Sequence, residues 1–348
     1  AGLPAELTAG VEYNYNSLND YYIATQRRLD QQTSTIGLFA QNEWKSDKVN
    51  FLVGFRLDKH NMIERPIISP RANIRYSPIE ALGLRLSYSS GYRAPQAYNE
   101  DLHIDALNHT VSIIKLSEEL RPEFSHSLSL SADYYHNFGR VQTNLLVEGF
   151  YTMLNDVFTL EKIGVGEAGE IIKERRNGSG AHIGGITLEA KLGIPNRFDV
   201  QFGYTFQKSL YVEPEQWSED VEAQRTMFRS PDHYGYLNAK YFITKDFNAS
   251  LFGTYTGPML VQHSAYTDIF GVEHPDSETR TQSFWDFGCK LSYTFSLSNV
   301  VNLEINAGVK NILDSYQRDI DMGAGRDSAY IYGPALPRTY FFGVKLFL

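Results

Sequence analysis

The last ten residues, 339–348, constrain most what this chain can fold into. Side chains alternate across an extended strand, so one face of this stretch holds Tyr340, Phe342, Val344, Leu346 and Leu348. That face is wholly apolar, whereas the opposite face carries a glycine and a lysine. A transmembrane β-barrel needs strands of about ten residues with one apolar side. An inward-facing strand of a soluble β-sandwich would look the same, so this stretch alone leaves both architectures open.

The same alternation recurs along the whole chain, for example in residues 7–15, 49–57, 198–206 and 285–295. We count about 14 such strands, arranged in hairpins with arms of about ten residues. No apolar run reaches the roughly 18 residues that a membrane helix requires. Aromatic residues make up 14% of the chain, with 23 Tyr and 21 Phe, as suits a barrel with aromatic girdles. The sequence therefore predicts an all-β fold, an antiparallel transmembrane β-barrel of the outer-membrane type.

The connections alternate between tight turns and long loops. The long loops are expected near residues 17–33, 60–67, 93–122, 155–180, 210–232, 259–282 and 314–337, and every other connection is short. Short turns at one rim and long loops at the other are the arrangement of outer-membrane barrels. A β-sandwich has no reason to segregate loop lengths in this way.

The faces opposite the apolar rows are too polar for a dry core. They hold Glu12, Asn14, Asn50, Arg56, Asp58, Glu189, Lys191, Gln201, Asp286, Lys290, Glu304 and Lys310. Burying such groups without partners costs several kcal/mol each, about 2–7 for a neutral polar group. These residues are therefore expected to face a wet or plugged lumen, and a soluble sandwich lectin is the weakest alternative.

Composition excludes several classes of function. The net charge of -9 argues against a nucleic-acid partner, which would require a basic stripe. The single cysteine, Cys289, excludes an internal disulfide framework and a Cys-based zinc site. The sequence holds no G-x-S-x-G, H-E-x-x-H or phosphate-binding loop, so we expect neither an enzyme nor a resident cofactor.

The most specific signal is a pair of short motifs that flank one long loop. Tyr92-Arg93-Ala94-Pro95 follows a strand, and Leu120-Arg121-Pro122-Glu123 leads into the next one. The pair resembles the aromatic-Arg-Ala-Pro and Leu-Lys/Arg-Pro-Glu boxes of TonB-dependent outer-membrane receptors. Residues 309–314 and 337–340 resemble two further elements of that family. Both prolines bias their neighbours to extended backbone. The boxes are interpreted as structural loop anchors, in which Arg93 and Arg121 have Glu100 and Glu123 as candidate carboxylate partners.

The resemblance implies a larger protein than this chain. Receptors of this kind resemble 22-stranded barrels with a plugged lumen, so about 14 strands leave roughly eight unaccounted for. Residues 1–348 are therefore expected to be the C-terminal part of the barrel, without the N-terminal plug domain and the first strands. The resemblance places the protein in the outer membrane of a Gram-negative bacterium, among membrane lipids and lipopolysaccharide. It also implies contact with the TonB energy-transducing complex through the missing N-terminal part.

The resemblance implies import of a scarce organometallic nutrient: an iron-siderophore chelate, haem or cobalamin. Haem receptors carry a ligating histidine between the two boxes, where this chain has His103 and His109. Aromatic residues mixed with acids mark other loops, and the ligand-binding candidates there and beside the first box are Tyr98, Tyr211, Trp217, Tyr266, Tyr330 and Tyr332. Their acids, Asp319, Asp321 and Asp327 among them, are interpreted as a solvated rim, with Ca²⁺ binding as the alternative. His182, His233, His263 and His274 are expected to be solvated.

The main alternative is a passive channel, or a transporter of hydrophobic substrates, that is complete with about 14 strands. A complete channel would need neither a plug nor TonB. The two hypotheses differ in the size of the natural protein and in its dependence on energy.

Overall fold

The computed structural model describes residues 4–22, 27–97, 112–166, 171–334 and 336–348. Within these ranges every regular element is a β-strand, so no membrane-spanning helix is found there. Fourteen antiparallel strands follow one another in a single sheet. They are β1 (Ala5–Tyr22), β2 (Arg27–Lys45), β3 (Val49–His60), β4 (Ile67–Ile79), β5 (Leu82–Arg93), β7 (Glu123–Phe138), β8 (Val141–Asn155), β11 (Gly180–Ile194), β12 (Phe198–Glu215), β14 (His233–Phe242), β15 (Phe247–Thr256), β20 (Phe284–Ser296), β21 (Asn302–Lys310) and β22 (Thr339–Phe347). The predicted all-β architecture and the number of strands are confirmed.

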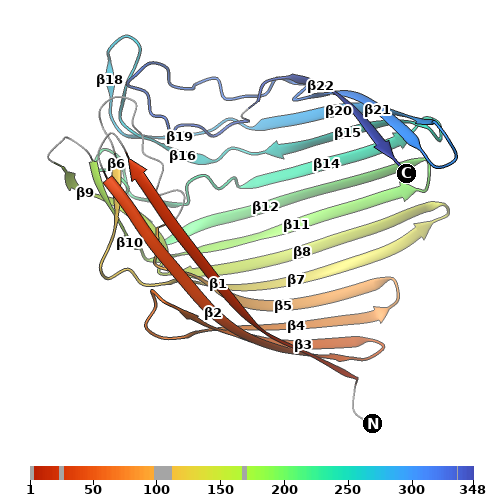
Figure 1. The fold of residues 1–348 in the computed structure, drawn as a ribbon, viewed down its shortest axis with the longest axis horizontal. Coiled ribbons are helices and arrows are strands. Elements are labelled where there is room, and N and C mark those ends of the chain that lie inside the picture. The colour runs from red at the N-terminus through yellow and green to blue at the C-terminus, as the bar shows by residue number, and fades with distance from the viewer. Residues whose placement is uncertain (1–3, 23–26, 98–111, 167–170, 335) are drawn as a thin grey trace.

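The sheet is strongly curved, and its two ends differ (Figure 1). Tight turns join the strands at one end, on the right of the view, and the long loops gather at the other. The chain begins β1 and ends β22 at the end with the tight turns. Among the described residues β1 pairs only with β2, and β22 pairs only with β21, so both are edge strands.

One face of the sheet is apolar and exposed from β1 to β22. Its exposed side chains include Val11, Phe55, Ile74, Leu130, Val147, Ile186, Phe202, Leu251, Leu291, Phe342 and Val344. The register places these residues beside one another on neighbouring strands, for instance Phe51 beside Ile74 and Ile305 beside Val344. An exposed apolar face of this extent suits a hydrocarbon environment rather than water. The alternation predicted for the C-terminal strand therefore holds for the whole sheet.

A belt of aromatic and imidazole rings crosses this outer face toward the loops. Three tyrosine hydroxyls lie at hydrogen-bonding distance from the Nδ1 atom of a histidine on a neighbouring strand: Tyr88 from His126 at 2.9 Å, Tyr151 from His182 at 2.9 Å and Tyr204 from His233 at 3.0 Å. Tyr255 and Trp285 continue the belt, with ring centroids 4.2 Å apart. The prediction that His182 and His233 are solvated loop residues is wrong, because both lie on strands as partners of tyrosines. Rings with one polar group are typical of a membrane interface.

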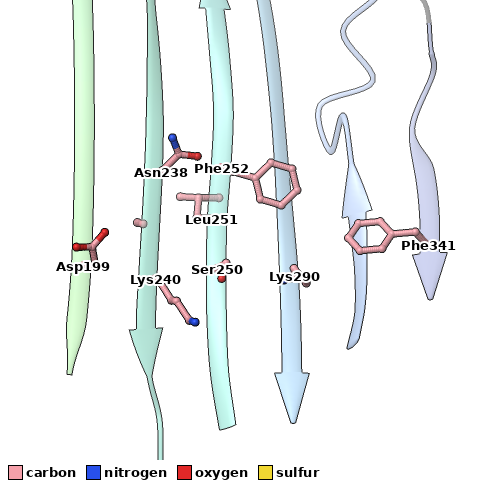
Figure 2. A pocket seen from close by; sticks show the side chains of 9 residues that line it. Asp199, Asn238, Lys240, Ser250, Leu251, Phe252, Lys290 and Phe341 are labelled. Atoms are coloured by element: carbon pink, nitrogen blue, oxygen red, sulfur yellow. The ribbon is translucent and has the colours of Figure 1, made fainter. Parts of the chain in front are cut away.

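The opposite face lines the lumen, and glycines there make room for aromatic rings. A Cβ atom built on Gly10 of β1 would lie 2.5 Å from the Phe39 ring of β2. Figure 2 shows the Phe252 and Phe341 rings each lying across a neighbouring strand. These rings cover Gly288 and Gly308, whose Cβ atoms would lie 2.5 Å from them. The lumen wall is therefore packed locally by ring-on-glycine contacts between neighbouring strands.

The long loops contain more strands than the sequence predicted. The small strands are β6 (Ser112–Leu116), β9 (Phe158–Val165), β10 (Ile171–Asn177), β13 (Gln224–Thr226), β16 (Leu260–His263), β17 (Tyr266–Thr267), β18 (Glu273–His274) and β19 (Ser277–Arg280). In addition, the stretch 17–33, predicted as a loop, is mostly the continuation of β1 and β2, which stay paired from Ser17–Gln32 to Tyr22–Arg27. Polar side chains on both faces indicate that this part projects beyond the membrane, and they do not prevent backbone pairing.

Candidate functional site

The candidate site lies at the loop end of the sheet, where two long loops pack on each other. We call the described residues of 257–283 and 311–338 the loop platform. Hydrogen bonds from backbone N–H groups help to tie the two loops together: the backbone N–H of Ser264 donates to Asp327 Oδ2 at 2.8 Å, and Thr267 N–H donates to the Gly325 carbonyl at 2.9 Å. A third, from the Met259 N–H to the Thr281 hydroxyl at 3.0 Å, closes the first loop on itself. Because the first two bonds join segments far apart in the sequence, the platform is a tertiary structure.

Four aromatic rings form a continuous stack through the platform. The centroids of Tyr330 and His263 are 3.6 Å apart, those of His263 and Tyr266 4.4 Å, and those of Tyr266 and His274 4.5 Å. All three interplanar angles are 12° or less. His263 is 8% exposed, and its Nε2 atom lies 2.7 Å from Asp321 Oδ2. The prediction that His263 is solvated is wrong, because the fold stacks it between two tyrosines and pairs it with a carboxylate.

Asp319 brings two tyrosine hydroxyls together at the edge of the stack. The Tyr330 hydroxyl donates to Asp319 Oδ2 at 2.9 Å, and the Tyr332 hydroxyl donates to Oδ1 of the same carboxylate. Burial, with the nearby Asp319 carboxylate, raises the pKa of Tyr332 far above its usual value and raises that of Tyr330 as well. Both phenols are therefore neutral donors at physiological pH.

The backbone that carries the two tyrosines is held from behind by two side chains. The Gln317 amide donates to the Tyr330 carbonyl at 2.9 Å and accepts from the Tyr332 N–H at 2.9 Å. Arg229, in the neighbouring loop, donates to the carbonyls of Ala329 and Ile331 at 2.7 and 2.9 Å. These contacts hold the backbone from which the two phenols project.

A third loop is attached to the platform through acidic side chains. Trp217 Nε1–H donates to Glu278 Oε1 at 3.1 Å, and Gln224 donates to the other oxygen of Glu278. The Ser218 hydroxyl donates to Asp276 at 2.6 Å. Trp217, Tyr266, Tyr330 and Tyr332 are thus held within one assembly of loops. Within the residues that the structure describes, no three His, Cys, Asp or Glu side chains converge as a metal site would require.

The two boxes lie at another part of the loop end and have structural contacts. Ala94 is buried against Ile63 and Ile67, with Tyr92 and Phe124 packed on this cluster. The Arg93 guanidinium lies over the Phe158 ring, 5.4 Å from its centroid. Pro95 is buried. The first box therefore anchors the end of β5 in a small apolar core.

The second box is held by β9, β10 and the turn before β9. Arg121 forms an ion pair with Asp156 at 2.6 Å, and its backbone N–H donates to Asn177 at 2.8 Å. The Glu123 carboxylate accepts the backbone N–H of Phe158 at 3.0 Å. Leu120 and Pro122 are half-buried beside these contacts. Arg121 thus pairs with Asp156. Glu123, one of the two carboxylates predicted as candidate partners, binds the backbone of Phe158 instead.

Below the loops, basic side chains line parts of the lumen. Arg56 pairs with Glu12 and Asp58, each at 2.8 Å. Arg75 of β4 stands directly opposite Arg85 of β5, and both are exposed. Farther along the sheet, a hollow is lined by Asp199, Asn238, Lys240, Ser250 and Lys290 (Figure 2). The lumen wall can therefore meet an anionic group.

The comparisons with known proteins agree with this geometry. Residues 1–312 match the protein family described as TonB dependent receptor-like, beta-barrel. The chain belongs to the TonB-dependent receptor family. The matched region is the β-barrel of that family, which lies in the outer membrane.

Solved structures of TonB-dependent receptors show the same fold. The siderophore receptor PirA from Acinetobacter baumannii is 15% identical, with a TM-score of 0.68, over 99% of this chain and 52% of that chain. A mutant of the ferric enterobactin receptor PfeA from Pseudomonas aeruginosa is 18% identical, with a TM-score of 0.67, over 99% and 51%. The ferric-catecholate import receptor Fiu from K12 E. coli is 16% identical, with a TM-score of 0.68, over 99% and 52%. This chain spans about half the length of these structures. No curated protein matches the chain significantly.

The TonB-dependent receptor fold brings some of the predicted site residues together and separates others. Tyr266, Tyr330 and Tyr332 meet in the loop platform, whereas Tyr211 lies on β12 in register with the buried Ala181. Tyr98, His103 and His109 lie outside the described residues. Sequence reasoning missed the structural roles of His263, Asp321 and Gln317. The sequence offered one signal for Asp319 and Asp321: both lie in the loop whose mixture of aromatic and acidic residues made Tyr330 a ligand-binding candidate.

Proposed function

We propose that the protein is a TonB-dependent receptor that imports an iron-siderophore chelate across the outer membrane. Membership of the TonB-dependent receptor family carries this proposal. Three similar structures are those of a siderophore receptor, a ferric enterobactin receptor and a ferric-catecholate import receptor. Such chelates are anionic or neutral and bear aromatic or hydroxamate groups. The exposed Arg75 and Arg85 in the lumen and the tyrosines of the loop platform suit such a ligand.

The experiment is uptake of radioactive iron by cells that depend on this protein. Cells that express the full-length natural protein, and lack their other ferric receptors, are offered ferric catecholates, ferric hydroxamates, haem and cobalamin in turn. We expect uptake of one ferric chelate at nanomolar concentration. Uptake of haem or cobalamin without uptake of any ferric chelate would contradict the proposed ligand class, although the protein would still belong to the TonB-dependent receptor family.

We also propose that residues 1–348 are the C-terminal part of a larger barrel whose lumen holds an N-terminal plug. Two observations support this proposal: β1 and β22 have unpaired outer edges in the described residues, and the chain spans about half of similar receptors. Unpaired edges inside a bilayer cost several kcal/mol per unsatisfied backbone group, so further strands are needed between β22 and β1. An intact mass for the natural protein well above 39.6 kDa is expected. A mass near 39.6 kDa would favour the passive channel.

Lipopolysaccharide is the proposed lipid partner on the outer face. Lys208 and Arg280 both approach the Asp232 carboxylate, the second at 3.6 Å, next to His233 of the aromatic belt. Because Lys208 and Arg280 share a single carboxylate, this site keeps a net positive charge, which would attract the phosphate groups of the lipid. Changing both cations to alanine should lower the lipopolysaccharide that remains bound to the purified receptor in native mass spectrometry. An unchanged amount would contradict this contact.

A further inference from the structure

We propose that Asp319, Tyr330 and Tyr332 form a binding site for ferric ion at the mouth of the barrel. The site would take a hard trivalent cation through one carboxylate and two phenolate oxygens, while the chelate that delivers the iron, or water, fills the other positions. The physiological meaning of the site rests on the proposed import of iron, but the binding itself does not.

The geometry brings one carboxylate and two phenolic oxygens into a single hydrogen-bonded cluster. Each oxygen of the Asp319 carboxylate accepts a hydrogen bond from one phenol, at 2.9 Å for Tyr330. The rings of Tyr330 and Tyr332 lie edge to face, with centroids 5.3 Å apart, so that both hydroxyls point at the same carboxylate. An ion that replaces the two hydrogen-bonding protons would therefore meet all three side chains.

The charge around Asp319 leaves room for a cation. Within the described part of the chain, no lysine, arginine or histidine forms an ion pair with the Asp319 carboxylate. The adjacent Arg318 instead lies over the Tyr316 ring, 5.8 Å from its centroid. Asp321 and Asp327, nearby in the same loop, are engaged by His263 and by backbone N–H groups. Asp319 is thus an exposed carboxylate whose partners are two neutral phenols.

The ion and proton balance fits a trivalent metal. On binding, Fe³⁺ displaces the two phenolic protons to solvent, against the raised pKa of both phenols, and the site then holds three negative charges from one carboxylate and two phenolates. Fe³⁺ contributes three positive charges, so the occupied site is neutral and the cost of burying charge falls. Hard oxygen ligands without sulfur or nitrogen favour a hard cation. A divalent ion would leave the same ligand set with a net negative charge.

The ligands are pre-organised, and two of the three are accessible. Gln317 and Arg229 hold the backbone of 329–332, and His263 stacks on the Tyr330 ring. Phe284 packs against the Tyr332 ring with centroids 5.9 Å apart. Asp319 is exposed, and Tyr332 is half-buried. An incoming chelate can therefore reach the carboxylate and the outer phenol without unfolding the loop.

The test uses the full-length receptor purified in detergent and ferric nitrilotriacetate as the probe. Binding of iron to phenolate oxygens produces a visible tyrosinate-to-iron charge-transfer band, which water or carboxylate ligands alone do not give. We expect one iron per receptor and such a band. Tyr332→Phe and Asp319→Asn should each weaken iron binding at least tenfold. Tyr316→Phe in the same loop is the matched control and should leave the band unchanged.

The outcomes separate this site from the proposed function. Absence of the band in the wild type, or its persistence in a Tyr330→Phe/Tyr332→Phe double variant, would overturn the site. Because Tyr330 is buried, heat-modifiable electrophoretic mobility checks that each variant is folded, and the exposed Asp319→Asn change gives the same test without disturbing the stack. If the wild type takes up a ferric chelate but shows no band, the site is wrong and the import function stands. If the band forms but no ferric chelate is imported, the iron site stands and the proposed import function is wrong.

Discussion

The imidazole of His263 is joined to the carboxylate of Asp321 across two loops, with Nε2 and Oδ2 2.7 Å apart and both side chains almost buried. These residues are 58 positions apart in the sequence. The pair therefore joins the two loops of the platform, together with the hydrogen bonds of Ser264 and Thr267.

Removing that carboxylate should loosen the platform. Asp321→Ala leaves the buried imidazole nitrogen without its partner, which costs about 1–3 kcal/mol of local stability. Faster amide hydrogen exchange in residues 260–263 and 327–330 is the expected result. Glu219→Ala, in an exposed position of another loop, is the control and should change nothing in these segments. Equal protection in Asp321→Ala and the wild type would mean that the pair does not hold the loops together.

Asn311 should be among the most sensitive positions in the last loop. It is 2% exposed, adopts φ of 47°, and its side chain makes three hydrogen bonds, to Ser315 N–H, Ser315 O and Leu336 O. Asn311→Ala should lower the free energy of unfolding by about 2–4 kcal/mol, because it loses these bonds and strains the backbone.

The glycine variant separates the two contributions at this position. Asn311→Gly loses the hydrogen bonds but tolerates positive φ, so it should be less destabilised than Asn311→Ala. Asn299→Ala, in an exposed turn, is the control. Unfolding in urea, followed by heat-modifiable mobility, measures all three variants. Equal stability of the Ala variant and the wild type would contradict the role assigned to Asn311.

A double-variant cycle tests the ring-on-glycine packing in the lumen. Gly10→Ala places a methyl group against the Phe39 ring and should cost about 1–3 kcal/mol. Phe39→Leu should relieve much of that cost, so the two changes should not be additive. Gly149→Ala is the control, because a Cβ atom there has nothing within 4 Å. Additive effects at Gly10 and Phe39 would show that the contact is not what requires glycine.

Charge on the two faces of one strand should have different effects. Leu130 of β7 is on the exposed apolar face, whereas Ser129 faces the lumen beside Phe150. Leu130→Arg should cost about 2–4 kcal/mol because arginine meets hydrocarbon, and less receptor should reach the outer membrane. Ser129→Arg should insert normally. Similar yields of both variants in purified outer membranes would contradict the assignment of the faces.

The strands could be predicted from the sequence because their period of two is local and repeated. The alternation of 339–348 reappears in β22 with Phe342 and Val344 on the outer face. The stretch 17–33 was misjudged because polarity reports contact with water, and a strand that extends beyond the bilayer is polar on both faces. The backbone pairing of β1 with β2 in this part does not depend on alternating apolar and polar residues, so the sequence pattern could not reveal it.

The candidate site could be predicted only in part. The mixture of aromatic and acidic residues near Tyr330 and Tyr332 marked the right loop, but the role of His263 depends on a contact with Asp321 that no local pattern encodes. Asn311 stood in a motif that resembled the family, yet its burial follows from the way 311–336 folds back on itself. Long-range loop contacts of this kind require the fold.

We infer that this barrel belongs to an energised receptor and not to a passive channel. The most direct test of this inference is uptake of a ferric chelate by cells that express the full-length natural protein, with and without TonB. We expect saturable uptake that disappears when TonB is absent, because opening of the lumen requires energy from the inner membrane. Uptake that continues without TonB, and rises linearly with chelate concentration, would contradict it and identify a passive channel.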